Sequence, residues 1–343
     1  MNRPLVSVMI TNWNGEDVIG ECLSSLFQQD YKNIEVIVLD NNSYDGSKDI
    51  IKKKFKNVRL IESNSNLGFA EGNNVAVRKA KGEYILLLNS DTVVTGNFLA
   101  ILINQLKKDK KIGVIQPKIL FKSNSLHKDR TINSIGAFFT NTGFLYYVGY
   151  GKKANIPLYD NEREIFSAYG ACMLIRKKVI EEVGLFDSDF FLYFEETDFC
   201  IRVWLAGWKI VYTPWSVIYH KGGVSARKFG TEKVFFHSFK NRICSYLKNF
   251  EVKTLIKVMP LHLAICECTA IAYLFLGRLN LFFAIQKAMF WNIRNLYKTL
   301  KKRDMIRRRI RKVRDVIFLS KVGKSPRLSY YIYLFKGLEY YKD

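Results

Sequence analysis

Residues 5–43, LVSVMITNWNGEDVIGECLSSLFQQDYKNIEVIVLDNNS, contain an apolar run, a helical pattern and a second apolar run. The runs at 5–11 and 34–39 are aliphatic or β-branched and are bounded by Asn, Asp and Gly, which is typical of buried strands. Residues 17–27 between them have apolar side chains at helical spacing, namely Val18, Ile19, Cys22, Leu23 and Leu26. This order predicts two parallel strands joined by a crossover helix.

The same alternation continues toward the middle of the chain. Further buried strands are expected at 58–61, 84–88 and 112–116. The rhythm predicts an α/β fold, in which a mainly parallel sheet carries helices on both faces. Ligands of such sheets bind in the crevice beyond the carboxyl ends of the strands.

Three of the predicted strands end in polar residues. The first runs into Thr11-Asn12-Trp13-Asn14-Gly15, the second into Asp40-Asn41-Asn42-Ser43 and the fourth into Asn89-Ser90-Asp91. Since parallel strands present their carboxyl ends at one edge, all three clusters are expected to face one crevice.

Asp91 is a candidate metal ligand. It follows the buried strand 84–88 and has neutral neighbours. A lone carboxylate there suits Mg²⁺ or Mn²⁺, hard cations that keep waters and share a diphosphate with the protein. The alternative is that Asp91 caps a helix that begins near Gly96.

Asp40 and Trp13 are candidates for binding a nucleoside. A carboxylate at the end of a strand can accept hydrogen bonds from a base or ribose. Alternatively, the Asp40 side chain can accept a hydrogen bond from the backbone of its own turn. Trp13 offers a flat face for stacking on a base, and the alternative is a packing role in the core.

The run FLYFEETDFCIR at 191–202 places three acids, Glu195, Glu196 and Asp198, in the first turn of a helix expected to end near Gly207. Acids there complement the helix dipole, and Asp198 is spaced to pair with Arg202. Adjacent carboxylates in an apolar wall also raise each other's pKa, which suits a general base working near neutrality.

His220 follows apolar residues near the end of the regular α/β pattern. A strand is expected at 209–213, ending at Pro214, and Gly222 and Gly223 follow the histidine. His220 is therefore a candidate metal ligand or diphosphate donor, or else a polar loop residue.

Several of these segments occur together in a fixed order. They are Val6-Ser7-Val8 to Asn14, Val38 to Ser43, Asn66-Leu67-Gly68-Phe69-Ala70-Glu71-Gly72-Asn73-Asn74, Leu88 to Asp91, Gly170 to Arg176, the acidic run Glu195 to Arg202, and His220. Over roughly residues 5–225 the combination resembles family 2 glycosyltransferases with the GT-A fold, particularly the rhamnosyltransferase-like branch.

This resemblance implies roles for the donor-side residues. Thr11, Trp13 and Asp40 would hold the nucleoside of a nucleoside-diphosphate sugar. Asn14, Asn42, Gly68, Asn73 and Asn89 are also expected at the donor.

The resemblance also implies a metal site and a catalytic base. Asp91 matches the metal-binding acid of the family's DxD-type motif, Asn89 replaces the Asp common at its other end, and His220 would support Mg²⁺ or Mn²⁺ and the diphosphate. Glu196 falls where the family has its base, with Glu195 and Asp198 as further catalytic acids. Glu in place of Asp moves the carboxylate one bond further out.

The expected activity is inverting transfer of a hexosyl or rhamnosyl group. A surface-glycan or lipid-linked acceptor is expected from the basic, aromatic-rich tail that runs from Ile271 to Tyr331. The GT-A domain is expected at 1–228, with a donor-binding half of about 1–118 and an acceptor-side half of about 119–228. Residues 120–165 are less regular, are expected to form an excursion with strands, and are expected to select the sugar. A helical, basic, membrane-associating region is expected at 229–343.

The net charge of +23 indicates an anionic partner. Much of the excess is contributed by Arg294, Lys298, Lys301, Lys302, Arg303, Arg307, Arg308, Arg309, Arg311, Lys312 and Arg314. An anionic membrane, nucleic acid or simple solvation all suit such a stretch.

Residues 258–277 are almost wholly apolar but contain Pro260, His262 and Glu267. A central acid is costly in lipid, and a single span would place the basic stretch outside, against the positive-inside rule. We therefore expect a half-buried hairpin lying in the membrane interface; a bundle packed on the catalytic domain is the alternative.

Other features of the chain indicate its cellular location and leave two alternative functions. The six cysteines form no CxxC pair and are expected to be reduced packing residues, and no export signal is visible. The predicted location is cytoplasmic, peripheral on the inner face of the cell membrane. No nucleic acid is expected as a partner, although a nucleic-acid-binding protein on an α/β scaffold and a sugar nucleotidyltransferase remain the alternatives.

Overall fold

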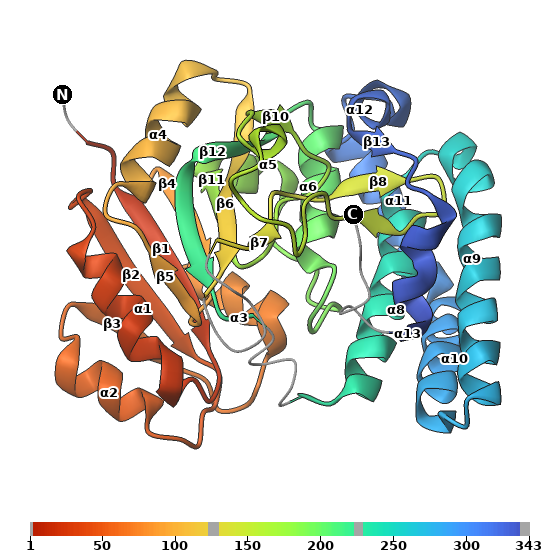
Figure 1. Cartoon of the computed structure of the whole chain (residues 1–343), viewed down its shortest axis with the longest axis horizontal. Helices are drawn as coiled ribbons and strands as arrows, with labels where there is room; N and C mark the ends of the chain where they lie inside the picture. The colour runs from red at the N-terminus through yellow and green to blue at the C-terminus, as the bar shows by residue number, and fades with distance from the viewer. Residues whose placement is uncertain (1–2, 123–129, 223–228, 337–343) are drawn as a thin grey trace.

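The computed structural model describes residues 3–122, 130–222 and 229–336 (Figure 1). Residues 223–228 lie outside the described residues. They include Gly223 and the last residue of the expected catalytic domain, whose boundary was expected between 228 and 229.

Within the described residues the main sheet has ten strands, in the order β10-β12-β6-β11-β4-β1-β2-β3, with β5 paired to β12 and β7 to β6. The strands are β1 (Val6–Asn12), β2 (Ile34–Asp40), β3 (Val58–Glu62), β4 (Tyr84–Leu88), β5 (Thr92–Val94), β6 (Ile112–Phe121), β7 (Ile132–Ser134), β10 (Arg163–Glu164), β11 (Cys172–Arg176) and β12 (Lys209–His220). The pairs β1–β2, β1–β4, β2–β3 and β6–β12 are parallel, whereas β11 is antiparallel to both β4 and β6. The carboxyl ends of β4, β1 and β2 therefore meet at one edge, as predicted.

Helices cover both faces of the sheet. Alternate side chains of β1 and β4 point to opposite faces, and each face packs with its own helices into a separate core. Val6, Val8 and Ile10 pack in one core with α1 (Glu16–Gln28), α2 (Ser47–Lys54) and α4 (Phe98–Lys108). Met9 packs in the other core with α3 (Gly68–Val77), α5 (Lys177–Val183) and α6 (Glu195–Leu205).

The end predicted for the last strand was wrong. Pro214 does not end β12, which continues to His220 with a register shift between Thr213 and Val217. Proline has no N–H for the ladder, so the chain bulges there and then resumes pairing with β6. This extension brings His220 beside Thr92 of β5.

The excursion after β6 consists of short elements, as expected. They are β7, β8 (Phe138–Thr140), β9 (Leu145–Tyr146), the 3₁₀ turn η1 (Pro157–Tyr159) and β10. Strands β8 and β9 form a small sheet with β13 (Gly323–Lys324) from the C-terminal region.

The C-terminal region is helical, as predicted, and Figure 1 shows it packed beside the sheet domain. Its elements are α8 (Thr231–Asn249), α9 (Val252–Phe275), α10 (Leu279–Arg294), α11 (Leu296–Arg309), α12 (Asp315–Val322), η2 (Leu328–Ile332) and α13 (Tyr333–Lys336). Buried residues of α8, including Ile243 and Tyr246, belong to the same core as Met9 and Phe199. The six cysteines are unpaired, and Cys268 alone among them is exposed.

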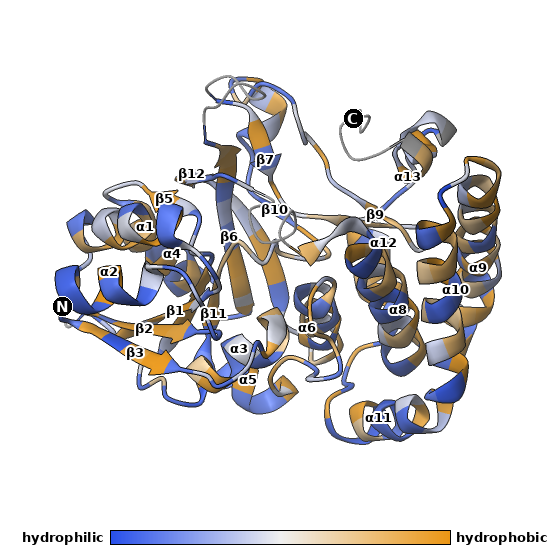
Figure 2. Ribbon diagram, turned by 90° about the horizontal axis from the view of Figure 1, so that it is seen from below, coloured by the Kyte–Doolittle hydropathy of each residue, from blue (hydrophilic) through white to orange (hydrophobic). Residues whose placement is uncertain are grey.

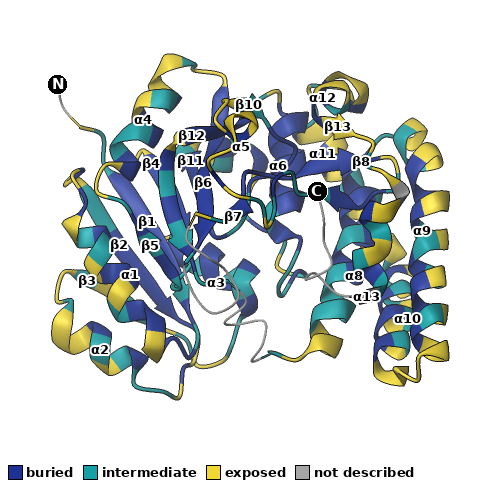
Figure 3. Ribbon diagram, in the orientation of Figure 1, coloured by how far each residue is buried: buried dark blue, intermediate teal, exposed yellow. Residues whose placement is uncertain are grey.

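Helices α9 and α10 form a hairpin on the outside of this region. Many of their residues are hydrophobic (orange in Figure 2), and their outer sides are exposed (yellow in Figure 3). Within the described residues α9 is the one helix long and apolar enough to cross a membrane, with 39% of its apolar window buried inside the protein. Glu267, the acid within it, accepts bonds of 2.9 and 3.0 Å from Gln286 of α10.

Candidate active site

The loops after β1 and β2 are joined through Asn12. Its buried Nδ2 lies 3.3 Å from Asp40 Oδ1, 3.3 Å from Ser43 Oγ and 2.9 Å from Ser47 Oγ. Asp40 Oδ2 accepts the Ser43 N–H at 3.0 Å, so Asp40 holds the turn that the sequence offered as its alternative role. Asp40 is only 1% exposed and lies beneath the surface of these loops.

The three residues that the sequence placed beside Asp40 lie around the same loops. Asn14, with φ +50°, accepts the Tyr44 N–H at 3.0 Å, whereas Asn42, with φ +63°, is exposed at the rim. The Trp13 ring is half-buried and meets the edge of Phe229, with ring centroids 5.8 Å apart.

Helix α3 covers Thr11 and contacts the acidic segment. Thr11 Oγ1 is buried and has no hydrogen-bond partner among the described residues. Gly68 has φ +74°, and a Cβ there would lie 2.2 Å from the Phe191 carbonyl oxygen, which accepts the Phe69 N–H at 2.7 Å. Asn73 donates to Phe69 O at 2.8 Å, so Gly68 and Asn73 have visible structural roles.

Asp91 and His220 meet at the end of β4. Asp91 Oδ1 lies 3.1 Å from His220 Nε2, which is 3.5 Å from Asn89 Nδ2. His220 Nδ1 lies 2.9 Å from Asn133 Oδ1, so Nδ1 is the donor and Nε2 faces Asp91. The helix-cap alternative for Asp91 is excluded, since the N-cap of α4 is Asn97.

The Asp91 carboxyl is set up to be ionised. Burial raises its pKa, but His220 and the Gly222 N–H outweigh this effect, so the pKa lies below its ordinary value.

The Asp91–His220 pair fits a divalent cation that also binds phosphate. A carboxylate oxygen and an imidazole nitrogen converge, and Asn133 orients the ring as metal-binding histidines require. No cluster of three or more His, Cys, Asp or Glu side chains forms a metal site in 3–122, 130–222 and 229–336. Two protein ligands leave positions for water and diphosphate oxygens, as Mg²⁺ prefers.

The acidic segment begins with an unusual turn. Tyr193 (φ 65°) and Phe194 (φ 72°) are both left-handed, and α6 starts directly after them with Glu195 and Glu196. The first helical hydrogen bond runs from the Asp198 N–H to Phe194 O at 2.9 Å.

The two glutamates differ in exposure. Glu195 is 4% exposed, and burial and Glu196 raise its pKa well above the ordinary value. Glu196 is half-buried, and burial raises its pKa to about 7. The Oε2 atoms of both carboxyl groups have no hydrogen-bond partner among the described residues.

Glu196 lines a small pocket that is linked to the Asp91–His220 pair through Tyr169. The pocket is lined by Glu196 with Ala137, Leu145, Tyr147, Ser167, Ala168, Tyr169 and Thr197. The Tyr169 ring also packs against His220, with ring centroids 5.9 Å apart, so Tyr169 contacts both the pocket and the histidine. Ala171, two residues later, accepts the Asn89 N–H at 2.9 Å.

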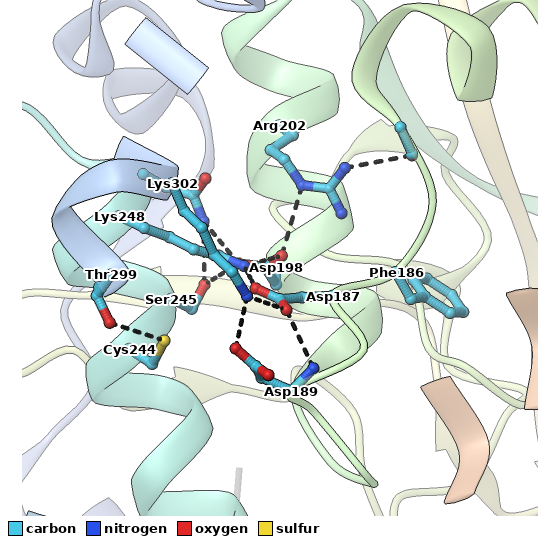
Figure 4. A network of polar contacts seen from close by, with 12 residues as sticks. Phe186, Asp187, Asp189, Asp198, Arg202, Cys244, Ser245, Lys248, Thr299 and Lys302 are labelled. Atoms are coloured by element: carbon cyan, nitrogen blue, oxygen red, sulfur yellow. Dashed lines mark hydrogen bonds and ion pairs between the residues drawn. The ribbon is translucent and has the colours of Figure 1, made fainter. Parts of the chain in front are cut away.

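Asp198 lies outside this pocket, although the sequence grouped it with the catalytic acids. It is fully buried and accepts bonds from Ser245 (2.8 Å) and Asn249 (2.7 Å) of α8 (Figure 4). It also pairs with Lys248 at 3.0 Å and with Arg202 at 3.4 Å, the pair that its spacing predicted. Its visible role is to join α6 to α8.

Some residues at the site were missed because the sequence gives no periodic signal for them. Asn133, Tyr147 and Tyr169 come from or follow the irregular excursion. The expectation that side chains of 120–165 line the pocket fits the positions of Ala137, Leu145 and Tyr147. Asn241 of α8, which is fully buried, was also missed, because nothing in the sequence distinguishes it from the other polar residues of this helix.

A family model described as Glycosyl transferase family 2 matches residues 7–184, just over half of the 343 residues. The match ends before Glu196 and His220.

Curated relatives are similar at a low level of identity. A low-salt glycan biosynthesis hexosyltransferase of Haloferax volcanii is 25% identical over 241 residues, covering 69% of this chain and 74% of that protein. An N-acetylglucosaminyl-diphospho-decaprenol L-rhamnosyltransferase of Mycobacterium tuberculosis is 25% identical over 227 residues, covering 60% and 72%. An uncharacterised protein of Sinorhizobium fredii is 26% identical over 233 residues; the match covers 65% of this chain and only 25% of that longer protein.

Among solved structures, a mannosyltransferase of Pyrobaculum calidifontis in complex with GDP-Man and Mn²⁺ matches with a TM-score of 0.52 at 18% identity. The match covers 85% of this chain and 76% of that one. At this identity the likeness is evidence for the fold alone, and it confirms the predicted GT-A fold. The predicted C-terminal helical region is present in the structure.

Proposed function

Because the chain belongs to glycosyltransferase family 2, we propose that it transfers one sugar, with inversion, from a nucleoside diphosphate to a surface-glycan or lipid-linked acceptor. One observation carries this proposal: Glu196, a half-buried carboxyl with a pKa of about 7, lines a pocket with Tyr169, whose ring packs against His220 of the Asp91–His220 pair. A single displacement needs a base for the acceptor hydroxyl and a group that stabilises the leaving diphosphate, and these two candidates are connected through Tyr169.

In the proposed reaction Glu196 takes the proton of an acceptor hydroxyl. The acceptor oxygen forms a bond to the anomeric carbon while the bond from that carbon to the diphosphate oxygen breaks, and the electron pair leaves with the diphosphate. Glu195, whose raised pKa keeps it protonated at neutral pH, leaves Glu196 as the one ionised acid of the pair. A product with the anomeric configuration of the donor would exclude this scheme.

Asp91 and His220 would hold Mg²⁺ or Mn²⁺, with Asn133 fixing the histidine ring and Asn89 beside it. When bound, the cation would neutralise charge developing on the leaving diphosphate. The Mn²⁺ in the Pyrobaculum mannosyltransferase structure supports this assignment.

The donor nucleoside is proposed to lie over the β1 and β2 loops. Thr11, with its partnerless hydroxyl oxygen, and the Trp13 ring stand at this edge, above the Asp40 turn. Asn14 and Asn42 would line the rim, with Gly68 and Asn73 shaping α3 behind it.

An anionic group on the acceptor is supported by Arg242 of α8. Its guanidinium lies over the rings of Phe144 at 4.5 Å and Phe194 at 5.3 Å, and its buried Nε has no hydrogen-bond partner among the described residues. Tyr147, which lines the Glu196 pocket, interacts electrostatically with both Glu196 and Arg242. A phosphate linking a sugar to a lipid carrier suits such a cation.

We place the enzyme on the cytoplasmic face of the membrane, with the outer side of α9 and α10 at the lipid surface. The exposed apolar residues of this hairpin support peripheral association, and Glu267 already has a partner within the hairpin.

The test is calorimetric binding of UDP, dTDP, GDP and ADP, with and without Mn²⁺. We expect one diphosphate to bind in a metal-dependent manner and Asp91→Ala to weaken it at least ~10-fold, since a charged ligand to the cation is lost. Asp109→Ala is the control, because Asp109 precedes β6 at the opposite edge of the sheet. If no diphosphate binds under either condition, the proposed function is refuted.

A further inference from the structure

The turn before the proposed base costs conformational energy. Tyr193 and Phe194 have φ values of 65° and 72°, and neither residue is glycine. Left-handed backbone in consecutive bulky residues persists only where the surroundings enforce it. The contacts that enforce this turn also decide where α6 begins.

Asn241 is the side chain that binds this turn from outside. Its Nδ2 donates to Leu192 O at 3.0 Å and to Tyr193 O at 2.7 Å. Asn241 is 0% exposed, so water cannot replace these bonds. Both accepting carbonyls belong to the peptides that flank the first left-handed residue.

Other α8 side chains form hydrogen bonds and ion pairs with neighbouring parts of the same segment. Lys248 pairs with Asp187 and Ser245 donates to Asp198 (Figure 4). Lys240 also donates to Asp189 O at 2.8 Å, and Asn249 donates to Asp198. These contacts hold the segment at both ends, whereas Asn241 binds the turn itself.

The turn determines the direction of the Glu196 carboxylate. A helix advances by about 100° per residue, so a start shifted by one residue would turn Glu196 out of its pocket. The Phe194 ring packs on Tyr246, with centroids 5.6 Å apart, but a ring contact does not fix the two carbonyls.

We propose that Asn241, from the C-terminal region, is a positioning residue that aims Glu196 by holding the left-handed turn at Tyr193 and Phe194. The inference rests on the proposed function and adds that the catalytic centre is incomplete without α8. The base therefore depends on a helix beyond residues 7–184, where the family match lies.

The experiment compares Asn241→Leu with Asn292→Leu. Asn292 is also a buried amide, 4% exposed, but it donates to Lys240 O and Ala288 O within the C-terminal helices. The readout is release of nucleoside diphosphate from UDP-GlcNAc, GDP-mannose and dTDP-rhamnose, with water as the acceptor, together with binding of the free diphosphates in Mn²⁺.

We expect Asn241→Leu to lower kcat ~10- to 100-fold relative to Asn292→Leu, with diphosphate affinity within about twofold of the wild type. The kcat loss should shrink in a Tyr193→Gly background, because glycine adopts the left-handed conformation without cost. If Asn241→Leu does not fold, Asn241→Ser is compared with Asn292→Ser in the same way.

Equal kcat values for the two leucine variants, or an undiminished loss in the Tyr193→Gly background, would overturn the positioning role. A wild-type chain that binds no diphosphate and cleaves no donor would instead refute the proposed function, so the two failures are distinguishable.

Discussion

Glu195 and Glu196 are consecutive residues of α6, yet their carboxyl groups have different surroundings. Glu195 is 4% exposed, whereas Glu196 is half-buried and opens on the pocket with Tyr147 and Tyr169. The more buried acid has the higher pKa and keeps its proton as pH rises, so Glu196 ionises first. The pair titrates as a unit, and its first deprotonation belongs mainly to Glu196.

Glu196→Gln is expected to lower kcat by ~10²–10⁴-fold, the usual contribution of a positioned base. In the wild type, kcat should rise with pH through an apparent pKa of about 7, because only the ionised carboxylate accepts the proton. A pH profile of kcat at saturating donor measures this limb.

The matched control is Glu195→Gln. An amide resembles the protonated acid that Glu195 is at neutral pH, so this variant should keep kcat within ~10-fold and retain the limb near pH 7. The opposite ranking of the two variants would assign the base to Glu195.

Some site residues were predictable because chain neighbours determine their positions. Asp91 follows the buried strand β4 by three residues, and Glu196 lies in the first turn of α6, so the sequence could identify both as candidates from local patterns. Asn133 and Asn241 were not predictable, since each meets its partner, His220 or Tyr193, only after distant segments have packed. The metal and base roles assigned from the sequence stay predictions.

At the scale of elements, a buried charge network joins α6, α8 and α11 (Figure 4). Lys248 pairs with Asp187 and Asp198, and Lys302 pairs with Asp187 and with Asp189. These two lysines hold the Asp187 pKa well below its ordinary value, against the effect of burial. Part of the basic excess in the C-terminal region therefore neutralises acids of the catalytic domain.

Lys248→Met is expected to lower the free energy of unfolding by about 3–5 kcal/mol, as when one partner of a buried ion pair is removed. Its side chain is 3% exposed, and its loss leaves Asp198 fully buried with only Arg202 as a cation partner. Urea denaturation followed by circular dichroism measures the change.

Lys298→Met provides the comparison within the same network. Lys298 pairs with Asp189, but its side chain is 55% exposed, so the loss should be no more than about 1 kcal/mol. Equal losses for the two variants would show that burial does not govern this network.

Regular elements were predicted well where periodicity was strong. The predicted helix at 17–27 is α1, Glu16–Gln28, and the predicted strand at 84–88 is β4. The sequence could not show that β12 crosses Pro214, because pairing with β6 resumes beyond the proline through contacts far apart in the chain. The antiparallel direction of β11 also depends on the whole sheet.

At the scale of the molecule, the α9–α10 hairpin carries many of the exposed large apolar side chains of the described residues. Its tip, defined as Phe275, Leu276, Leu279 and Phe283, is 85%, 60%, 50% and 51% exposed. Arg278 and Lys287 are exposed on the same hairpin. Apolar side chains beside basic ones suit an anionic lipid surface.

Deleting the C-terminal region would be a poor test of membrane binding. The deletion would remove Lys298 and Lys302, which pair with Asp189 close to the acidic segment. Substitutions confined to the exposed tip leave these contacts intact.

We therefore expect the double variant Phe275→Ser/Phe283→Ser to bind vesicles of equimolar phosphatidylcholine and phosphatidylglycerol at least ~10-fold more weakly than the wild type. Full burial of one phenylalanine contributes about 1.5–3 kcal/mol, so the partial insertion of two rings accounts for this factor. Vesicle co-sedimentation measures it. The control, Leu158→Ser/Trp215→Ser, removes side chains that are 60% and 53% exposed on the catalytic domain and should leave binding unchanged. If both double variants bind as the wild type does, the tip does not contact lipid, and the exposed hairpin requires another partner.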